Sequence, residues 1–259
     1  MKLQLVPARQ GVTWVRLGIR TFFSQPLALS GLFFMYAAVM EVAKDIPVVG
    51  LSLMLALMPG CSLGLMAASR EASTGKFPMP TVFLSAFRAG RQELVAMAQL
   101  GVLFVCGFWI ILGVTTLLDG GGFASGYLSG KMLPADMARD PAMQTAGLAF
   151  LLLLCLLSLM FWHAPALVHW HGVPVAKSIF FSLVACVRNF WAFMVFSMVW
   201  SAILMGALLV VSVVAGGVGD PTAAGVAMVS VIALVSAMVI TSTYFSFRDC
   251  FETPPEDTP

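Results

Sequence analysis

Six apolar stretches of about bilayer length constrain this chain more than any other feature of its sequence. They are predicted as helices at residues 26–43, 48–68, 94–118, 145–168, 190–215 and 225–247. A helix needs roughly 20 apolar residues to cross the hydrocarbon core. Its backbone groups must bond within the segment, because lipid offers them no partners. The sequence therefore predicts an all-α, polytopic transmembrane helix bundle of about six spans.

The composition supports the membrane interpretation. Hydrophobic residues make up 60% of the chain and charged residues only 10%, whereas about 25% of a soluble protein is charged. The formal net charge of +2 gives no argument for a nucleic-acid partner. We expect one six-span membrane domain at 26–247, preceded by a basic interfacial segment at 1–25. An acidic tail at 248–259 follows, and its composition predicts disorder.

The N-terminal segment carries a short amphipathic pattern. Between Val12 and Phe23, Arg16 and Arg20 lie one helical turn apart among aromatic and apolar residues. This pattern is typical of a helix that lies on the membrane surface; an ordinary positive flank to the first span explains it equally well. The segment lacks the apolar core and cleavage site of a signal peptide, so the first span is expected to remain as an anchor.

The distribution of basic residues predicts the orientation. Of the 14 Lys and Arg residues, all but Lys44, Lys131 and Arg139 lie on the side of the N-terminus. Cytoplasmic loops of membrane proteins carry the excess of Lys and Arg. We therefore predict a multi-pass membrane protein with both termini in the cytoplasm.

An internal repeat is predicted between units at about 48–118 and 145–215. When Gly75 is aligned with Gly172, Arg91 falls on Arg188, and each glycine precedes an amphipathic stretch that enters the next span. Both copies run in the same direction, which predicts a parallel repeat with a pseudo-axis along the membrane normal. Each copy also has a stripe of small polar residues on one helix face; the stripes are Thr81, Ser85 and Gln92, and Ser178, Ser182 and Asn189.

These stretches predict two interfacial helices at the cytoplasmic surface, one per repeat unit. The polar stripes are expected at the interface. Arginine side chains at this level can bind lipid phosphates or the acids of a neighbouring segment. The predicted lipid or partner contacts are Arg91, Arg188, Arg88 and Lys177.

A resemblance to known membrane proteins rests on two segments, ASREASTGKFPMPTVFLSAFRAGRQEL and HAPALVHWHGVPVAKSIFFSLVACVRNFWAF. They resemble a proteobacterial family of six-span inner-membrane proteins without an assigned function, and the likeness covers nearly the whole chain up to the acidic tail. A more distant likeness is to the membrane domain attached to some glycerophosphoryl diester phosphodiesterases, whose catalytic domain has no counterpart here. The family implies no catalytic residues.

The histidines, His163, His169 and His171, form the one cluster that suggests chemistry. A metal site needs two to four converging ligands, so the three are weak metal candidates. The favoured interpretation is that they sit at the membrane interface beside Trp162 and Trp170 with their polar tips toward the headgroups. No metal or other cofactor is predicted.

Function is only loosely constrained. The catalytic motifs G-x-S-x-G, H-E-x-x-H and the P-loop are missing, and no ionisable residue lies deep in a predicted span, which argues against a proton-coupled pump. We expect a non-enzymatic inner-membrane protein that binds membrane lipids, another membrane protein or a second copy of itself through the amphipathic helices. The alternative is a small permease for an uncharged or lipid-like molecule. A third, less favoured hypothesis is an enzyme acting at headgroup level around the histidines.

Overall fold

The computed structural model describes residues 3–84, 90–130, 140–218 and 220–251 of the 259. This part of the chain is helical and contains no strand. Six helices are long and apolar enough to cross a membrane, which confirms the predicted all-α polytopic bundle. The spans are formed by α2 (Pro26–Lys44), α3 (Gly50–Ser73), α5 (Arg91–Asp119), α8 (Pro141–Phe161), α11 (Phe190–Val218) and α12 (Pro221–Phe251), and the fourth span continues from α8 through α9 to His171. The shorter elements are α1 (Gln10–Ser24), η1 (Pro80–Leu84), α6 (Gly122–Ser129), α9 (Ala164–His171) and α10 (Val175–Arg188).

Local chemistry explains where several helices begin and end. The carboxylate of Asp140 accepts the N–H of Ala142 at 2.9 Å and so caps α8. At the other ends, α3 and α9 are followed by Gly75 and Gly172, whose φ angles are +81° and +61°. Glycine adopts this left-handed conformation without a steric penalty. Both predicted glycine turns are therefore present.

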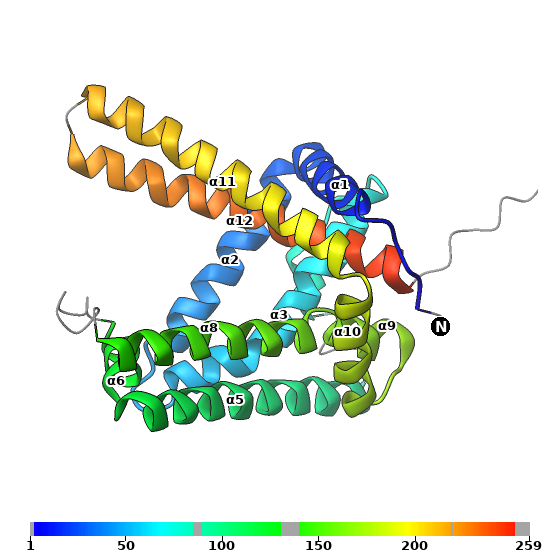
Figure 1. The fold of residues 1–259 in the computed structure, drawn as a ribbon. Helices are drawn as coiled ribbons and strands as arrows, with labels where there is room; N and C mark the ends of the chain where they lie inside the picture. Colours follow the sequence, from blue (N-terminus) through cyan, green and yellow to red (C-terminus); the bar gives the residue numbers. More distant parts are fainter. Residues whose placement is uncertain (1–2, 85–89, 131–139, 219, 252–259) are drawn as a thin grey trace, which may run out of the picture.

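The helices fan out from one end of the molecule (Figure 1). We call this end, where α1, α9 and α10 lie, the α1 end; the opposite end, with α6, is the α6 end. The layer of α5 and α8 and the hairpin of α11 and α12 lie close together at the α1 end and diverge toward the α6 end, with α2 between them.

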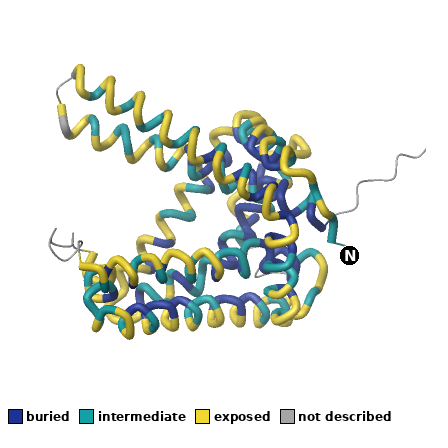
Figure 2. The backbone as a smooth tube through the Cα atoms, in the orientation of Figure 1, coloured by how far each residue is buried: buried dark blue, intermediate teal, exposed yellow. Residues whose placement is uncertain are grey.

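The outer half of the α11–α12 hairpin has little protein around it. Only 6% of the membrane-spanning window of α11 is buried, against 44% of that of α3. Figure 2 shows the exposed residues running along the whole outer part of the hairpin. Since these residues are apolar, they are suited to lipid contact.

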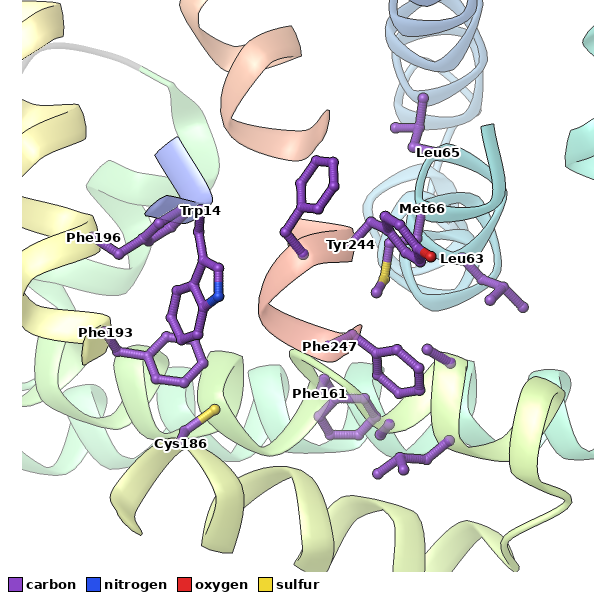
Figure 3. Close-up of a cluster of buried hydrophobic side chains, with 14 of the residues drawn as sticks. Trp14, Leu63, Leu65, Met66, Phe161, Cys186, Phe193, Phe196, Tyr244 and Phe247 are labelled. Atoms are coloured by element: carbon purple, nitrogen blue, oxygen red, sulfur yellow. The ribbon is translucent and has the colours of Figure 1, made fainter. Parts of the chain in front are cut away.

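The largest group of buried side chains gathers at the α1 end (Figure 3). Trp14 of α1, Leu63 of α3, Phe193 of α11 and Phe247 of α12 belong to one buried cluster. These residues join α1, α3, α11 and α12 at this end.

Glycines allow close helix contacts. A Cβ placed on Gly101 of α5 would lie 2.3 Å from the carbonyl oxygen of Ala56 in α3, and one on Gly18 of α1 would lie 2.4 Å from the Cβ of Ser242 in α12. Small residues at such crossings are typical of membrane helices, where packing must supply much of the association energy.

The basic N-terminal segment forms α1, which includes the predicted helical stretch Val12–Phe23. Its apolar face packs on α11 and α12: Trp14 is fully buried, and its ring centroid lies 5.1 Å from that of Phe193. The apolar face of α1 therefore contacts protein, whereas the surface-helix interpretation expected that face to enter lipid.

The second predicted interfacial helix is α10, which crosses the end of α8 at a steep angle (Figure 1). In the first copy, the described residues between Gly75 and Arg91, where α5 begins, include the short η1, with Phe83 packed on Gly64 of α3. The stripe residue Ser85 and the basic residue Arg88 lie outside the described residues. The repeat itself stays a prediction.

The acidic tail begins later than predicted. The chain is helical through Phe251 because Cys250 and Phe251 are buried in the cluster and Arg248 is ion-paired with Asp249. The predicted disorder from Arg248 is wrong for these residues, and residues 252–259 lie outside the described part.

Candidate functional site

A cavity of about 300 Å³ lies among five spans. Its wall is mainly apolar and comes from α2, α3, α5, α8 and α12, and Pro59 inside α3 forms part of it. The lining residues are Tyr36, Met58, Pro59, Ser62, Leu65, Met66, Phe104, Ser158, Phe161, Trp162, Val239, Ile240 and Thr243. Its volume is at the lower end of the range of small-molecule pockets, roughly 300–1,000 Å³.

The polar groups of this cavity are hydroxyls and one indole. Ser62, Ser158 and Thr243 donate their hydrogens to backbone oxygens of their own helices, at 2.9, 2.8 and 2.7 Å. Their oxygens retain lone pairs that can accept a further hydrogen bond. Among the described residues, none that lines the cavity is charged. The wall therefore suits an uncharged, largely apolar occupant.

A second cavity of about 430 Å³ lies beside the first, between α2, α3 and η1. Its lining is almost wholly apolar and includes Val39, Leu57 and Phe83. Tyr36 lines both cavities, and Thr81 of the predicted polar stripe borders the second one. Tyr36 is thus part of the wall of both cavities.

The predicted basic contacts lie at the α1 end. Arg91 is the first residue of α5, Lys177 lies in the first turn of α10 and Arg188 is its last residue. All three side chains are exposed, and none forms a salt bridge within the described residues. They are available to an anionic group, but they do not line either cavity.

The second polar stripe is buried against protein, which differs from the interfacial position expected for it. The Ser182 hydroxyl donates to the Leu159 carbonyl at 2.8 Å and accepts the His163 N–H at 2.9 Å. Ser178 is also fully buried. The reason is that α8 ends near this point, so its unpaired backbone groups need polar partners.

Asn189, the last residue of the second stripe, also bonds backbone groups of another segment. Its amide oxygen accepts the N–H of Val6 at 2.8 Å, and its amide nitrogen donates to the carbonyl of Gln4 at 3.1 Å. On the other side of α10, Phe180 and Val187 are exposed. The helix therefore presents its polar face to protein and an apolar face outward, as a helix embedded in lipid does.

The two described residues of the first stripe have no comparable burial. Thr81 and Gln92 are exposed. The aligned positions of the two predicted units thus differ in surroundings.

The three histidines have separate surroundings. The Nε2 of His163 lies 3.1 Å from the hydroxyl oxygen of Ser246, and the Nδ1 of His169 lies 2.5 Å from the carboxylate of Glu93. The ring of His171 lies 5.7 Å from that of Phe247. Within the described residues, no three metal-ligating side chains gather. The sequence cluster is therefore not a spatial cluster.

His163 is the most enclosed of the three. Ser246 donates its hydrogen to the Thr243 carbonyl, so the His163 Nε2 is assigned as the donor to Ser246. The Nδ1 is then a buried acceptor, and it has no partner within the described residues. The surrounding rings include Phe193 and Phe251. This neutral tautomer fits a packed histidine rather than a proton carrier.

Sequence reasoning missed the polar junction between α1 and α12. The Asp249 carboxylate accepts hydrogen bonds from the Gln10 amide at 2.6 Å and the Trp14 indole at 2.9 Å. It also pairs with the adjacent Arg248. The partners lie at opposite ends of the sequence, and no local spacing links them. The one available signal was an acid two residues after the end of the sixth predicted span.

The chain is similar to the "Probable inner membrane protein BTH_II0599" of Burkholderia thailandensis. The two are 34% identical over 254 residues, which cover 97% of this chain and 94% of the relative. No family model matches the chain, and no solved structure does. The likeness extends over all six spans.

Proposed function

Because this chain belongs to the family of the Burkholderia inner-membrane protein BTH_II0599, we propose that it acts inside the bilayer, as a non-enzymatic lipid-binding protein. The observation that carries the proposal is the cavity among five spans, whose described lining is uncharged and mainly apolar and includes a few hydroxyl groups. The apolar part of a lipid-like molecule occupies this cavity. A polar group on that molecule donates to the free lone pairs of Ser62, Ser158 or Thr243.

The divergence of the helices gives the lipid-like molecule a route from the bilayer to the cavity. The hairpin of α11 and α12 separates from the layer of α5 and α8 toward the α6 end (Figure 1). Val239, Ile240 and Thr243 of α12 form one wall of the cavity. A lipid chain lying beside the hairpin reaches this wall laterally, without crossing water.

The exposed basic residues supply a place for a charged headgroup. Arg91, Lys177 and Arg188 lie at the α1 end, which the charge distribution assigns to the cytoplasm together with both termini. A phosphate there is attracted by the arginine side chains, which can bind it with two parallel hydrogen bonds. A membrane-protein partner or a second copy with an acidic face would use the same residues.

A second candidate function is a permease for an uncharged or lipid-like molecule. The observation in its favour is that Tyr36 lines both cavities. A rotation of this one side chain would join the two spaces. Transport of a fluorescent lipid analogue across proteoliposomes tests this function, and a Tyr36→Ala variant should change its rate.

The lipid-binding proposal is tested by filling the cavity. Ser158→Phe places a ring in it, whereas Ser230→Phe places the same ring on the exposed surface of α12. The serines are matched, because each donates to the carbonyl four residues earlier. The proteins are purified in native lipid particles, and bound lipids are measured by mass spectrometry. We expect Ser158→Phe alone to lose co-purifying lipid; retention of the full lipid complement by a folded Ser158→Phe variant would refute the proposal.

A further inference from the structure

We propose that the outward face of α1 binds the phosphate groups of anionic phospholipids. This site is separate from the cavity and holds lipid from outside the bundle. It is defined by Arg9, just before the helix, and by Arg16 and Arg20 within it.

The three arginines share one face. Arg9 and Arg16 are seven residues apart and Arg16 and Arg20 four, spacings that place side chains on the same side of a helix. All three are exposed, and none has an ion-pair partner within the described residues. The sequence of α1, QGVTWVRLGIRTFFS, contains no acid. The face thus carries uncompensated positive charge.

Apolar side chains are interleaved with these charges. Val12 and Phe23 lie on the same face, and Phe23 is 62% exposed. Leu27, at the start of α2, is 87% exposed. Large apolar groups next to arginines are typical of a surface at the boundary between lipid chains and headgroups. An acidic soluble protein would leave these side chains uncovered.

The depth of α1 in the membrane follows from its short connection to α2. Only Gln25 separates the end of α1 from Pro26, where the first span begins. Arg20 lies less than two turns before that span. The arginine face must therefore lie close to the headgroup layer, where phosphate is the abundant anion.

The opposite face of α1 is fixed to the protein. Gly11 abuts the backbone of Ala192, and Gly18 abuts Ser242. Asp249, the acid that packs on α1, is bonded to Gln10, Trp14 and Arg248 on this buried side. The arginines are consequently presented on a rigid helix, which lowers the entropic cost of binding.

The experiment compares the full chain in nanodiscs of phosphatidylcholine with and without phosphatidylglycerol. Native mass spectrometry counts the bound phosphatidylglycerol. We expect Arg16→Gln with Arg20→Gln to weaken its binding, by roughly fivefold per arginine removed. The charge-preserving pair Arg16→Lys with Arg20→Lys should keep most of the binding. Lys44→Gln, which removes a cation at the α6 end, should leave it unchanged.

Two results would overturn the proposal. The first is unchanged phosphatidylglycerol binding by the double-Gln variant. The second is an equal loss in the Lys44→Gln control, which would indicate a response to net charge. Unfolding temperatures in phosphatidylcholine alone establish that each variant is folded. If Ser158→Phe loses cavity lipid, this test is unaffected, since no described residue of α1 lines the cavity.

Discussion

The indole nitrogen of Trp14 donates to the carboxylate of Asp249 at 2.9 Å and thereby joins the first helix of the chain to the last. Trp14 is fully buried, and Gln10 shares the same carboxylate oxygen at 2.6 Å. One acid thus holds two side chains of α1 against the end of α12. The bonds stabilise the point from which the helices fan out.

Asp249→Ala should destabilise the protein by about 1.5–3 kcal/mol, the range for hydrogen bonds to charged groups. The physical reason is that the buried indole N–H of Trp14 loses its acceptor. The measurement is thermal unfolding in nanodiscs, followed by tryptophan fluorescence. Asp249→Asn keeps an acceptor oxygen and should recover part of the loss. Equal unfolding temperatures for the wild type and the Ala variant would show that this junction contributes nothing.

Asn189→Ala should release the N-terminal segment. Asn189 is buried and bonds the backbone of Gln4 and Val6, so its removal takes away the acceptor of the Val6 N–H and one donor to the Gln4 carbonyl, at a cost of about 1–3 kcal/mol. Hydrogen exchange at residues 4–6 should accelerate. The control is Gln92→Ala, at the aligned position of the first predicted repeat unit, where the side chain is exposed. If hydrogen exchange at residues 4–6 is the same in both variants, the buried Asn189 does not hold the N-terminal segment in place.

Gly101→Ala should lower the unfolding temperature, because the new Cβ would lie 2.3 Å from the Ala56 carbonyl oxygen and force α3 and α5 apart. Gly113→Ala, in the same helix, meets nothing within 4 Å and should be neutral or slightly stabilising. The comparison by differential scanning calorimetry isolates the contact from helix propensity. A drop of the same size in both variants would argue against close packing of these two helices.

Cys186 should resist alkylation in the folded protein. Burial raises the pKa of its thiol, and the thiolate is the species that reacts. The thiol stays protonated as pH rises through the ordinary cysteine range, so no labelling by a water-soluble maleimide is expected there. A cysteine replacing the exposed Lys177 on the same helix should react under those conditions. Rapid labelling of Cys186 would mean that α10 turns its polar face outward.

Much of the bundle could be predicted because its signal is local. The spans expected at 26–43 and 94–118 are Pro26–Lys44 and Arg91–Asp119. Length and apolarity suffice to identify a membrane helix. The glycine turns at Gly75 and Gly172 were equally visible, since only a few neighbouring residues determine them.

The candidate site could not be predicted in the same way. The pattern of α10 defines two faces, but in lipid either face can point outward, so the burial of Ser178 and Ser182 depends on the end of α8. The cavity depends on how five helices pack, and Tyr36 and Ser158 lie far apart in the sequence. The histidines were close in sequence and looked like a group, yet α9 separates them, because His163 caps its start whereas His169 and His171 lie in its last turn.

The weakly packed hairpin makes the protein responsive to bilayer thickness. With 29 residues, α11 is about 43 Å long at 1.5 Å per residue, whereas the hydrocarbon core is about 30 Å thick. Such a mismatch is relieved by tilting. Because α11 and α12 are anchored chiefly at the α1 end, their tilt follows the membrane around them. The outer half of the hairpin is then the part whose tilt differs most between thin and thick bilayers, whereas Val239 and Ile240 lie in the packed half and keep their place in the cavity wall.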